Sequence, residues 1–396
     1  MINQAVYDKL VAQFEAYFGK KPEVVSYAPG RIEVLGNHTD YNEGFVFSAA
    51  INSGTFFAIA PNTLGKNRVV AGDLMHEVSF PLSGAKPVKT DTWANYVIGT
   101  VAGLDNIKPQ TTGFDGMFLG NVPMGFGLSS SAALEMCTAK AVCELYGIQA
   151  DTVTLAKIGQ AAEHDYAGCS CGLLDQISSL CGAYGKLVKT DFRTLKVETV
   201  DIGPDVCFLM CNPHAKHALV DGQYNTRRKA CEDAARFFAK TLSHPVTALR
   251  DVSMAEWEAY KDGLDPVVAN RAAHPIGEDE RVLKGAALLE AGDLAAFGQL
   301  LFDSHESSRV MFENSCKELD DVVAIARTVP GVLGARLSGG GFGGSVVVLV
   351  NARDAETAAK AIASAYAAKV GGGATCEVSR IQPSQGASIV YSTVAH

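Results

Sequence analysis

The sequence lacks the segments by which proteins bind nucleic acids or enter membranes. Its 396 residues carry a net charge of −9, without a basic run of the kind that follows a nucleic-acid backbone or an anionic membrane surface. The first twenty residues mix charged and apolar side chains at helical spacing, with neither the continuous apolar core of a signal peptide nor a membrane span. We therefore expect a cytoplasmic protein with no nucleic acid and no membrane among its partners.

Cysteine and histidine pairs at the spacing of a zinc site are also missing. Residues 169–171 and 214–217 each hold one such pair, but no second pair follows at a matching distance. Most of the ten cysteines instead lie inside apolar runs, as do Cys137, Cys143, Cys207 and Cys211. In a chain without export signals, this pattern indicates reduced, packed thiols rather than a disulfide framework.

Two common nucleotide-binding motifs are absent or out of context. The P-loop pattern G-x-x-x-x-G-K-[ST] does not occur. Residues 339–344 satisfy G-x-G-x-x-G by letter, but this loop runs into the valine-rich segment 346–350, which is typical of a strand. A dinucleotide-binding loop follows a strand and opens a helix, so the sequence favours neither a P-loop NTPase nor a nicotinamide enzyme.

A different phosphate-binding pattern is present at 121–135, NVPMGFGLSSSAALE. Gly125 and Gly127 let the backbone approach a ligand closely. The serines at 129–131 place hydroxyl and amide groups at the start of an apolar helix predicted over 132–145, where free N–H groups and the helix dipole favour a phosphate. Taken alone, the same residues also fit a serine N-cap on a buried helix.

Length and composition predict two domains of mixed α and β structure. A chain of 396 residues exceeds the size at which single cores stop growing, and 47% hydrophobic with 19% charged residues is ordinary for a globular protein. Polar residues after position 30 lie between strand-like segments at 24–30 and 45–51, where binding sites are commonly built. Residues 242–332 are predicted to be mainly helical.

Three segments, in this order, resemble the three motifs of the GHMP small-molecule kinases. They are APGRIEVLGNHTDYNEG (28–44), VPMGFGLSSSAALE (122–135) and LSGGGFGGS (337–345). Further segments are similar to galactokinases, namely TDYNEGFVF (39–47), WANYVIG (93–99), CGLLDQ (171–176), TDFR (190–193), QYNTRRKACE (223–232), SHESSR (304–309) and SCKELD (315–320). The chain is therefore identified as a member of the galactokinase family.

This resemblance implies a fold and an organisation. The fold is α+β, the GHMP kinase fold, with an N-terminal ribosomal-protein-S5-like domain, a C-terminal ferredoxin-like domain and the active site in the cleft between them. We place the domains at 1–195 and 196–396, with the last strands as candidates to return to the first domain. A monomer or weak dimer is expected.

The resemblance also implies an ATP-dependent sugar 1-kinase that uses magnesium, with phosphate passing from ATP to the anomeric hydroxyl of a sugar. Asp175 matches the family's acid near this hydroxyl, and Arg31 matches the arginine that pairs with it. As a carboxylate, Asp175 can accept the hydroxyl proton. Because phosphoryl transfer needs mainly positioning and charge neutralisation, the other predicted residues are binding groups.

The predicted binding residues fall into three groups. Those implied for the sugar are Asn37, His38, Asp40, Gly172, Asp175 and Tyr224. Those implied for ATP are Gly125, Gly127, Leu128, Ser129, Ser130, Ser131, Trp93, Gly340 and Gly341. The magnesium ligands are Ser130 or Ser131 together with Glu163.

The chain departs from the family pattern at two positions. Asn37 stands where galactokinases carry a glutamate that helps to bind the C6 hydroxyl, and Glu33 stands where an asparagine is expected. The exchange at 37 removes an acceptor and adds a donor, and sites that hydrogen-bond substrate hydroxyls discriminate sharply. D-Galactose is the first choice of substrate, and another hexose, a ketohexose at its C1 hydroxyl or an amino sugar, is the alternative.

A second alternative is a galactokinase-like sugar sensor without catalytic activity. Such sensors resemble galactokinases with a shortened serine-alanine loop. Here the serine-alanine run at 129–133 is intact, and both Arg31 and Asp175 are present. The sequence therefore favours an enzyme.

Overall fold

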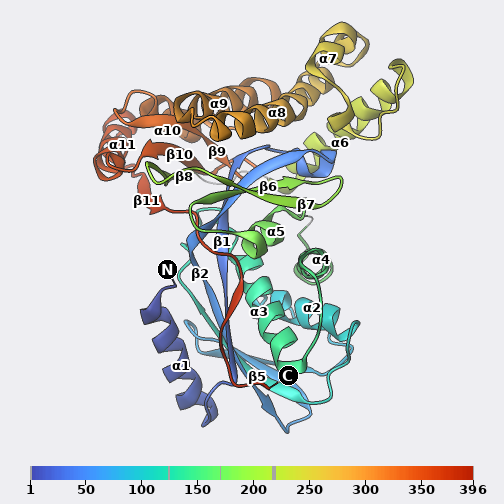
Figure 1. The fold of residues 1–396 in the computed structure, drawn as a ribbon, viewed down its shortest axis with the longest axis vertical. Helices are drawn as coiled ribbons and strands as arrows, with labels where there is room; N and C mark the ends of the chain where they lie inside the picture. The colour runs from blue at the N-terminus through green and yellow to red at the C-terminus, as the bar shows by residue number, and fades with distance from the viewer. Residues whose placement is uncertain (1, 124, 170, 216–219, 396) are drawn as a thin grey trace.

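The computed structural model of the chain describes residues 2–123, 125–169, 171–215 and 220–395. Within these ranges it contains two β-sheets with helices packed against them. Figure 1 shows the first sheet running through the lower half of the molecule, and the second sheet lying at the top beneath a layer of helices. Among the described residues, no helix has the length and apolar character needed to cross a membrane.

The first sheet has eight strands within the described part of the chain. In chain order they are β1 (Val24–Leu35), β2 (Phe45–Asn62), β3 (Lys66–Ala71), β4 (His76–Pro81), β5 (Gly113–Gly120), β6 (Lys186–Asp191), β7 (Lys196–Asp201) and β12 (Ser388–Ser392). The main path is β12-β1-β2-β5-β3-β4, and the β6–β7 hairpin adds to β2. The pairs are antiparallel except β3 with β5.

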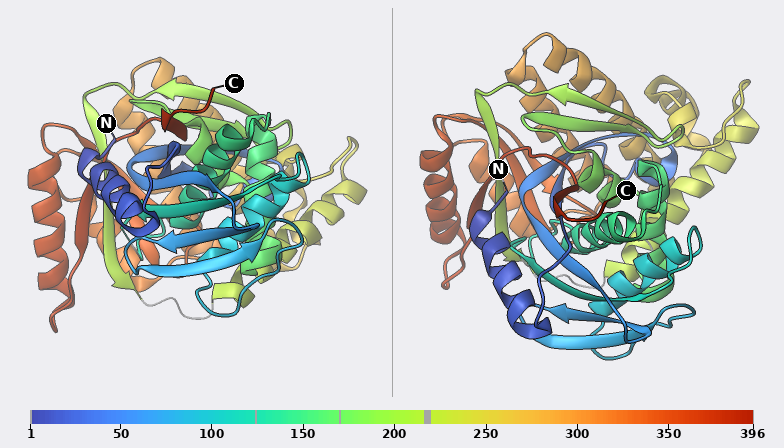
Figure 2. Two further views of the ribbon diagram at one scale, coloured as in Figure 1. Left: turned by 90° about the horizontal axis from the view of Figure 1, so that it is seen from below. Right: turned by 60° about the horizontal axis from the view of Figure 1, so that its bottom comes forward.

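Helices cover both faces of this sheet, as Figure 2 shows. They are α1 (Gln4–Phe18), α2 (Ala94–Asp105), α3 (Ser130–Tyr146), α4 (Thr152–Ala162) and α5 (Leu174–Cys181). Val25 and Phe56 pack with α1, whereas their neighbours Val24 and Phe57 pack with α2 and α3. The two-residue period of a strand thus serves two cores, which is why β1 is buried along its whole length.

The second sheet has the order β11-β8-β10-β9 and is antiparallel throughout. Its strands are β8 (Val206–Ala215), β9 (Val332–Ser338), β10 (Gly344–Asn351) and β11 (Glu377–Ile381). The helices of this half are α6 (Val220–Thr241), α7 (Met254–Tyr260), α8 (Pro266–Glu290), α9 (Leu294–Ser307), α10 (Lys317–Ala326) and α11 (Ala355–Val370). The glycine-rich segment at 339–344 connects β9 to strand β10, as predicted.

The two sheets share a core where their faces meet. Phe208 and Val347 of the second sheet pack in one buried cluster with Val34 and Phe47 of the first. The β6–β7 hairpin carries the first sheet past residue 195, and β12 returns to pair with β1. The sheets are therefore interleaved in sequence, and the division at 195/196 stays a prediction about the folding units.

The predicted central helix is present as α3, and its side chains are buried on several faces. Ala132, Met136, Ala139 and Val142 are each inaccessible to solvent. An apolar helix of this kind belongs in an interior, where its start can be fixed against the sheet. This position brings the N-terminus of α3 next to β1.

Candidate active site

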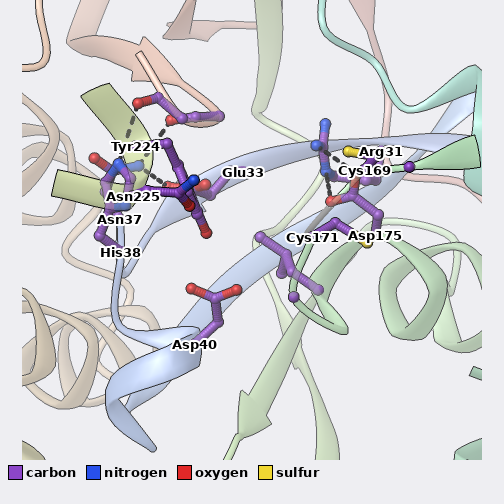
Figure 3. A pocket seen from close by; sticks show the side chains of 15 residues that line it. Arg31, Glu33, Asn37, His38, Asp40, Cys169, Cys171, Asp175, Tyr224 and Asn225 are labelled. Carbon is purple, nitrogen blue, oxygen red and sulfur yellow. Dashed lines mark hydrogen bonds and ion pairs between the residues drawn. The ribbon is translucent and has the colours of Figure 1, made fainter. Parts of the chain in front are cut away.

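A cavity of about 540 Å³ is lined from both halves of the chain. Its walls come from β1, the loop that follows β1, the approach to α5, the start of α6 and the β9–β10 loop. In Figure 3, Arg31 and Asp175 lie at one end, Asn37 and His38 lie at the other, and Asp40 stands apart from both groups. The cavity therefore brings together residues from all three sequence motifs except the serine loop, which lies beside it.

An arginine and a carboxylate form one end of the cavity. Arg31 Nε donates to Asp175 Oδ1 at 2.7 Å and Nη2 donates to Oδ2 at 2.9 Å, so both carboxylate oxygens are held. Asp175 lies in the first turn of α5, where the helix N-terminus favours negative charge. Its side chain is 22% exposed, which leaves it within reach of a ligand.

The glycine-serine loop is tied to the same arginine. Arg31 Nη1 donates to the carbonyl of Gly127 at 2.7 Å, and the Arg31 N–H donates to the carbonyl of Leu128 at 3.0 Å. Gly125 and Gly127 are exposed and have φ of 78° and 68°, a region that favours glycine. The side chain of Leu128 is buried in the core, so only its backbone can face a nucleotide.

The serines after this loop do not form the N-cap that the sequence alone allowed. Ser129 has a left-handed backbone with φ of 54° and makes no capping hydrogen bond, and its hydroxyl donates to Asp175 instead. Ser130 is exposed at the first position of α3. Ser131 Oγ donates to Glu163 Oε1 at 2.9 Å. A hydroxyl and a carboxylate side by side are oxygen ligands that suit a hard cation such as Mg²⁺.

The carboxylate of Glu163 lies in an electrostatic setting that a cation would relieve. Burial raises the pKa of Glu163, and the nearby charge of Asp175 raises it further. Glu135 of α3 is fully buried beside Glu163, and Gln176 Nε2 donates to Glu135 Oε2 at 2.9 Å. Several carboxyl groups thus gather near the serine loop without a basic side chain in these hydrogen bonds.

Asp40 faces the cavity from the turn that follows β1. Burial and the nearby Glu33 raise the pKa of Asp40 to about 6. A Cβ on Gly172 would lie 1.9 Å from Asp40 Oδ2, so the absence of a side chain at 172 lets the carboxylate occupy this place. A carboxylate can accept hydrogen bonds from two adjacent sugar hydroxyls.

His38 lies at the opposite end of the cavity from Asp175. Its Nε2 is 3.1 Å from the carbonyl of Gly340, and its Nδ1 is 2.9 Å from the Tyr41 hydroxyl. Burial lowers the pKa of His38 to about 4, so the ring is neutral at pH 7. Because a carbonyl only accepts, we assign the ring proton to Nε2. The ring of Tyr224 lies 5.3 Å from that of His38 and closes this end.

Asn37 lines the cavity, but its hydrogen-bonding groups are engaged with the protein. Its Nδ2 donates to Glu33 Oε1 at 2.9 Å and to the carbonyl of Gly339 at 2.8 Å, and its Oδ1 accepts from Asn314 Nδ2 at 3.0 Å. The residue is fully buried. A direct contact between Asn37 and sugar stays a prediction, whereas its role in joining β1 to the β9–β10 loop is plain.

Glu33 supplies a carboxylate at the same place. Its Oε1 also accepts from Arg336 Nη1 at 3.1 Å, and Arg336 is fully buried. Burial raises the pKa of Glu33, and the charge of Arg336 opposes this effect. The asparagine and glutamate of the family pattern have therefore changed places between 33 and 37, so that this wall still holds one amide and one carboxylate.

Comparison with known proteins identifies the family. Residues 12–61 match the family model described as the galactokinase galactose-binding signature, 95–183 match the GHMP kinases N terminal domain, and 286–368 match GHMP kinases C terminal. A curated galactokinase of Pasteurella multocida (strain Pm70) is 40% identical over 364 residues, which cover 90% of this chain and 93% of that protein. The chain belongs to the galactokinase family.

Solved structures agree with this assignment. The crystal structure of Lactococcus lactis galactokinase complexed with galactose has a TM-score of 0.90 and 31% sequence identity, and the match covers 97% of this chain and 99% of that one. A crystal structure of mevalonate kinase has a TM-score of 0.62 at 18% identity, covering 91% of this chain and 99% of that one, which is a likeness in fold. The predicted family and the GHMP kinase fold are confirmed.

Two residues predicted to bind ATP lie away from the cavity. Trp93 packs on Phe118 with ring centroids 5.2 Å apart, in the core between the first sheet and α2. Gly341 packs against Asn314, whose carbonyl would lie 2.2 Å from an added Cβ. Gly340, in contrast, lines the cavity. The nucleotide roles of these residues stay predictions.

Several residues that shape this galactokinase site were not among the predicted ones. Glu33, Asn225, Cys169 and Cys171 line the cavity. A charged residue within the apolar strand sequence RIEVL was a usable signal for Glu33, because an isolated charge in a buried strand needs a partner. The two cysteines carried only a weak metal-pair signal, and nothing local marks Asn225.

Proposed function

We propose that this member of the galactokinase family transfers the γ-phosphoryl group of ATP to the anomeric hydroxyl of D-galactose. The observation that carries the proposal is the doubly hydrogen-bonded pair of Arg31 and Asp175 in the cavity wall, next to the glycine-serine loop. A galactokinase complexed with galactose shares this fold at 31% identity. ATP is the phosphoryl donor of the family.

Arg31 and Asp175 act together in this proposal. The two hydrogen bonds from Arg31 fix the plane of the carboxylate, so that an oxygen of Asp175 meets the incoming hydroxyl in one orientation. Asp175 then orients the anomeric hydroxyl and accepts its proton as the oxygen attacks the γ-phosphorus. The hydroxyl of Ser129 holds the same carboxylate from the side of the phosphate loop.

The nucleotide is placed by the loop that ends in α3. Exposed N–H groups around Gly125 and Gly127 and the N-terminus of α3 favour the phosphates of ATP. Ser131, with Ser130 beside it, and Glu163 would hold Mg²⁺, which neutralises phosphate charge when bound. These residues give the phosphates one orientation relative to Asp175.

The sugar is recognised at the far end of the cavity. Asp40 accepts from two hydroxyls, the neutral His38 presents its ring edge, and Tyr224 closes the wall. The alternative substrate, another hexose, was suggested by the loss of glutamate at 37. The carboxylate of Glu33, hydrogen-bonded to Asn37, supports galactose instead, because an acceptor is still present at this wall.

The proposal is tested by an ADP-release assay of the purified protein over a panel that includes galactose, glucose, fructose and galactosamine. We expect galactose to give the highest kcat/KM. Faster turnover of a ketohexose or an amino sugar would replace the substrate, and no turnover of any sugar would remove the kinase activity. A cytoplasmic location and a monomeric or weakly dimeric state remain part of the proposal.

A further inference from the structure

The loop between β1 and β2 brings sugar-binding residues into the cavity on an unusual backbone. It carries Asn37, His38 and Asp40. Positive φ angles occur at Gly36 (95°), His38 (60°) and Glu43 (58°). Residues other than glycine rarely adopt this conformation, and the surrounding structure must hold them in it.

Two adjacent carboxylates on α8 reach both ends of this loop. Glu278 Oε2 accepts from the N–H groups of Gly36 at 2.9 Å and Asn37 at 2.8 Å. Asp279 Oδ1 accepts from the N–H of Phe45 at 2.6 Å. In Figure 1, α8 belongs to the helical layer at the top, above the first sheet. The loop is therefore anchored by a helix that is more than two hundred residues away in sequence.

The chemistry of these contacts is that of a fixed anion binding backbone donors. Glu278 is fully buried, and its Oε1 pairs with Arg281. Although burial alone would raise it, Arg281 and His274 hold the pKa of Glu278 well below its usual range. Hydrogen bonds from backbone N–H groups to an ionised acceptor are stronger than those to a neutral one. A Cβ at Gly44 would lie 2.3 Å from Asp279 Oδ1, so this glycine permits the second contact.

We propose that Glu278 and Asp279 are positioning residues that hold the sugar-binding loop in the geometry that binds substrate. In the described part of the chain, neither residue lines the cavity, so each acts through the loop. This rests on the proposed function only in that the ligand of the loop is a sugar. The expected signature is a change in sugar affinity that leaves ATP affinity in place.

The test compares variants of the full-length protein by steady-state kinetics, calorimetric sugar binding and thermal unfolding. Glu278→Gln turns one acceptor oxygen into a donor that faces either the backbone N–H groups or an arginine. We expect KM for sugar to rise at least about tenfold, with KM for ATP changed by less than about twofold. Asp279→Ala should act in the same direction, whereas Asp279→Asn keeps an acceptor and should act less.

Asp321→Asn is a matched control. Asp321 is a buried carboxylate of α10 that pairs with Lys317 and with Lys369, and it does not line the cavity. It should lower Tm without changing either KM. Equal changes in the two KM values of Glu278→Gln, or a loss of Tm alone as in Asp321→Asn, would overturn the proposal.

If Glu278→Gln does not fold, the pair of Asp279 variants decides. A higher sugar KM in Asp279→Ala than in Asp279→Asn supports the proposal, and wild-type values in both overturn it. These comparisons use the hexose that the wild-type protein phosphorylates best. The preference of the wild-type protein among hexoses tests the proposed function separately.

Discussion

Replacing Asn37 by glutamate, the residue that galactokinases carry there, is predicted to harm this protein. Asn37 Nδ2 lies 2.9 Å from Glu33 Oε1, so Asn37→Glu places two carboxylates in contact at a buried position. Two charges about 4 Å apart repel by about 4 kcal/mol at an effective dielectric constant near 20. Retaining one proton at pH 7 instead costs about 3 kcal/mol for an ordinary glutamate. Arg336 offsets part of this, so we expect a loss of about 2–4 kcal/mol in the free energy of unfolding.

The reciprocal change should repair the damage. Glu33→Asn alone leaves Arg336 buried without its carboxylate partner, which typically costs about 3–5 kcal/mol. The double variant Glu33→Asn/Asn37→Glu restores one carboxylate and one amide in the family's arrangement. Its loss should therefore be at least about 2 kcal/mol smaller than the sum of the two single losses. Activity with galactose should recover with stability.

Urea unfolding of the four proteins, together with kcat/KM for galactose, measures this coupling. Glu33→Gln serves as a control that removes the charge and keeps the side-chain length. Single losses that add to within about 0.5 kcal/mol would refute the reasoning, because independent sites behave in this way. So would an Asn37→Glu protein as stable and active as the wild type.

Three further predictions concern the reaction itself. Asp175→Asn should keep the fold and lose about 10²–10⁴-fold in kcat, because an amide does not take up the hydroxyl proton, and a wild-type kcat would contradict this. Ser131→Ala and Glu163→Gln should raise the Mg²⁺ concentration needed for half-maximal turnover while calorimetric sugar affinity stays unchanged; the opposite pattern would show misplaced roles. The pKa of Asp40, raised to about 6 by burial, puts the accepting carboxylate above pH 6. Sugar affinity should therefore fall about tenfold per pH unit below 6, and a sugar KM that is flat from pH 5 to pH 7 would count against the role of Asp40.

Local sequence patterns found the parts of the site that are continuous in the chain. The apolar helix after the serine run formed as α3, and Arg31 and Asp175, matched to the family by short motifs, lie in contact. Glycines at 125 and 127 adopt positive φ, as a loop that approaches a ligand requires. Each of these features depends on neighbouring residues or on a motif with a fixed geometry.

Features that depend on distant partners were not accessible in this way. Ser129 was expected beside ATP, but its hydroxyl reaches Asp175, which is 46 residues away. Glu278 lies in a helix whose sequence gives no sign that it contacts Gly36. Asn37 was taken as a sugar contact, although its amide is used by Glu33 and the β9–β10 loop. Periodicity reports which face of an element is buried, and it does not report what that face meets.

The central claim is that Asp175 directs phosphate from ATP to the anomeric oxygen of galactose. It is tested most directly by NMR of the product formed from D-galactose and ATP. The account predicts a single galactose phosphate whose phosphorus couples to the anomeric proton, and its absence in the Asp175→Asn reaction. Phosphate on any other oxygen of galactose, or unchanged product formation by Asp175→Asn, would contradict the account.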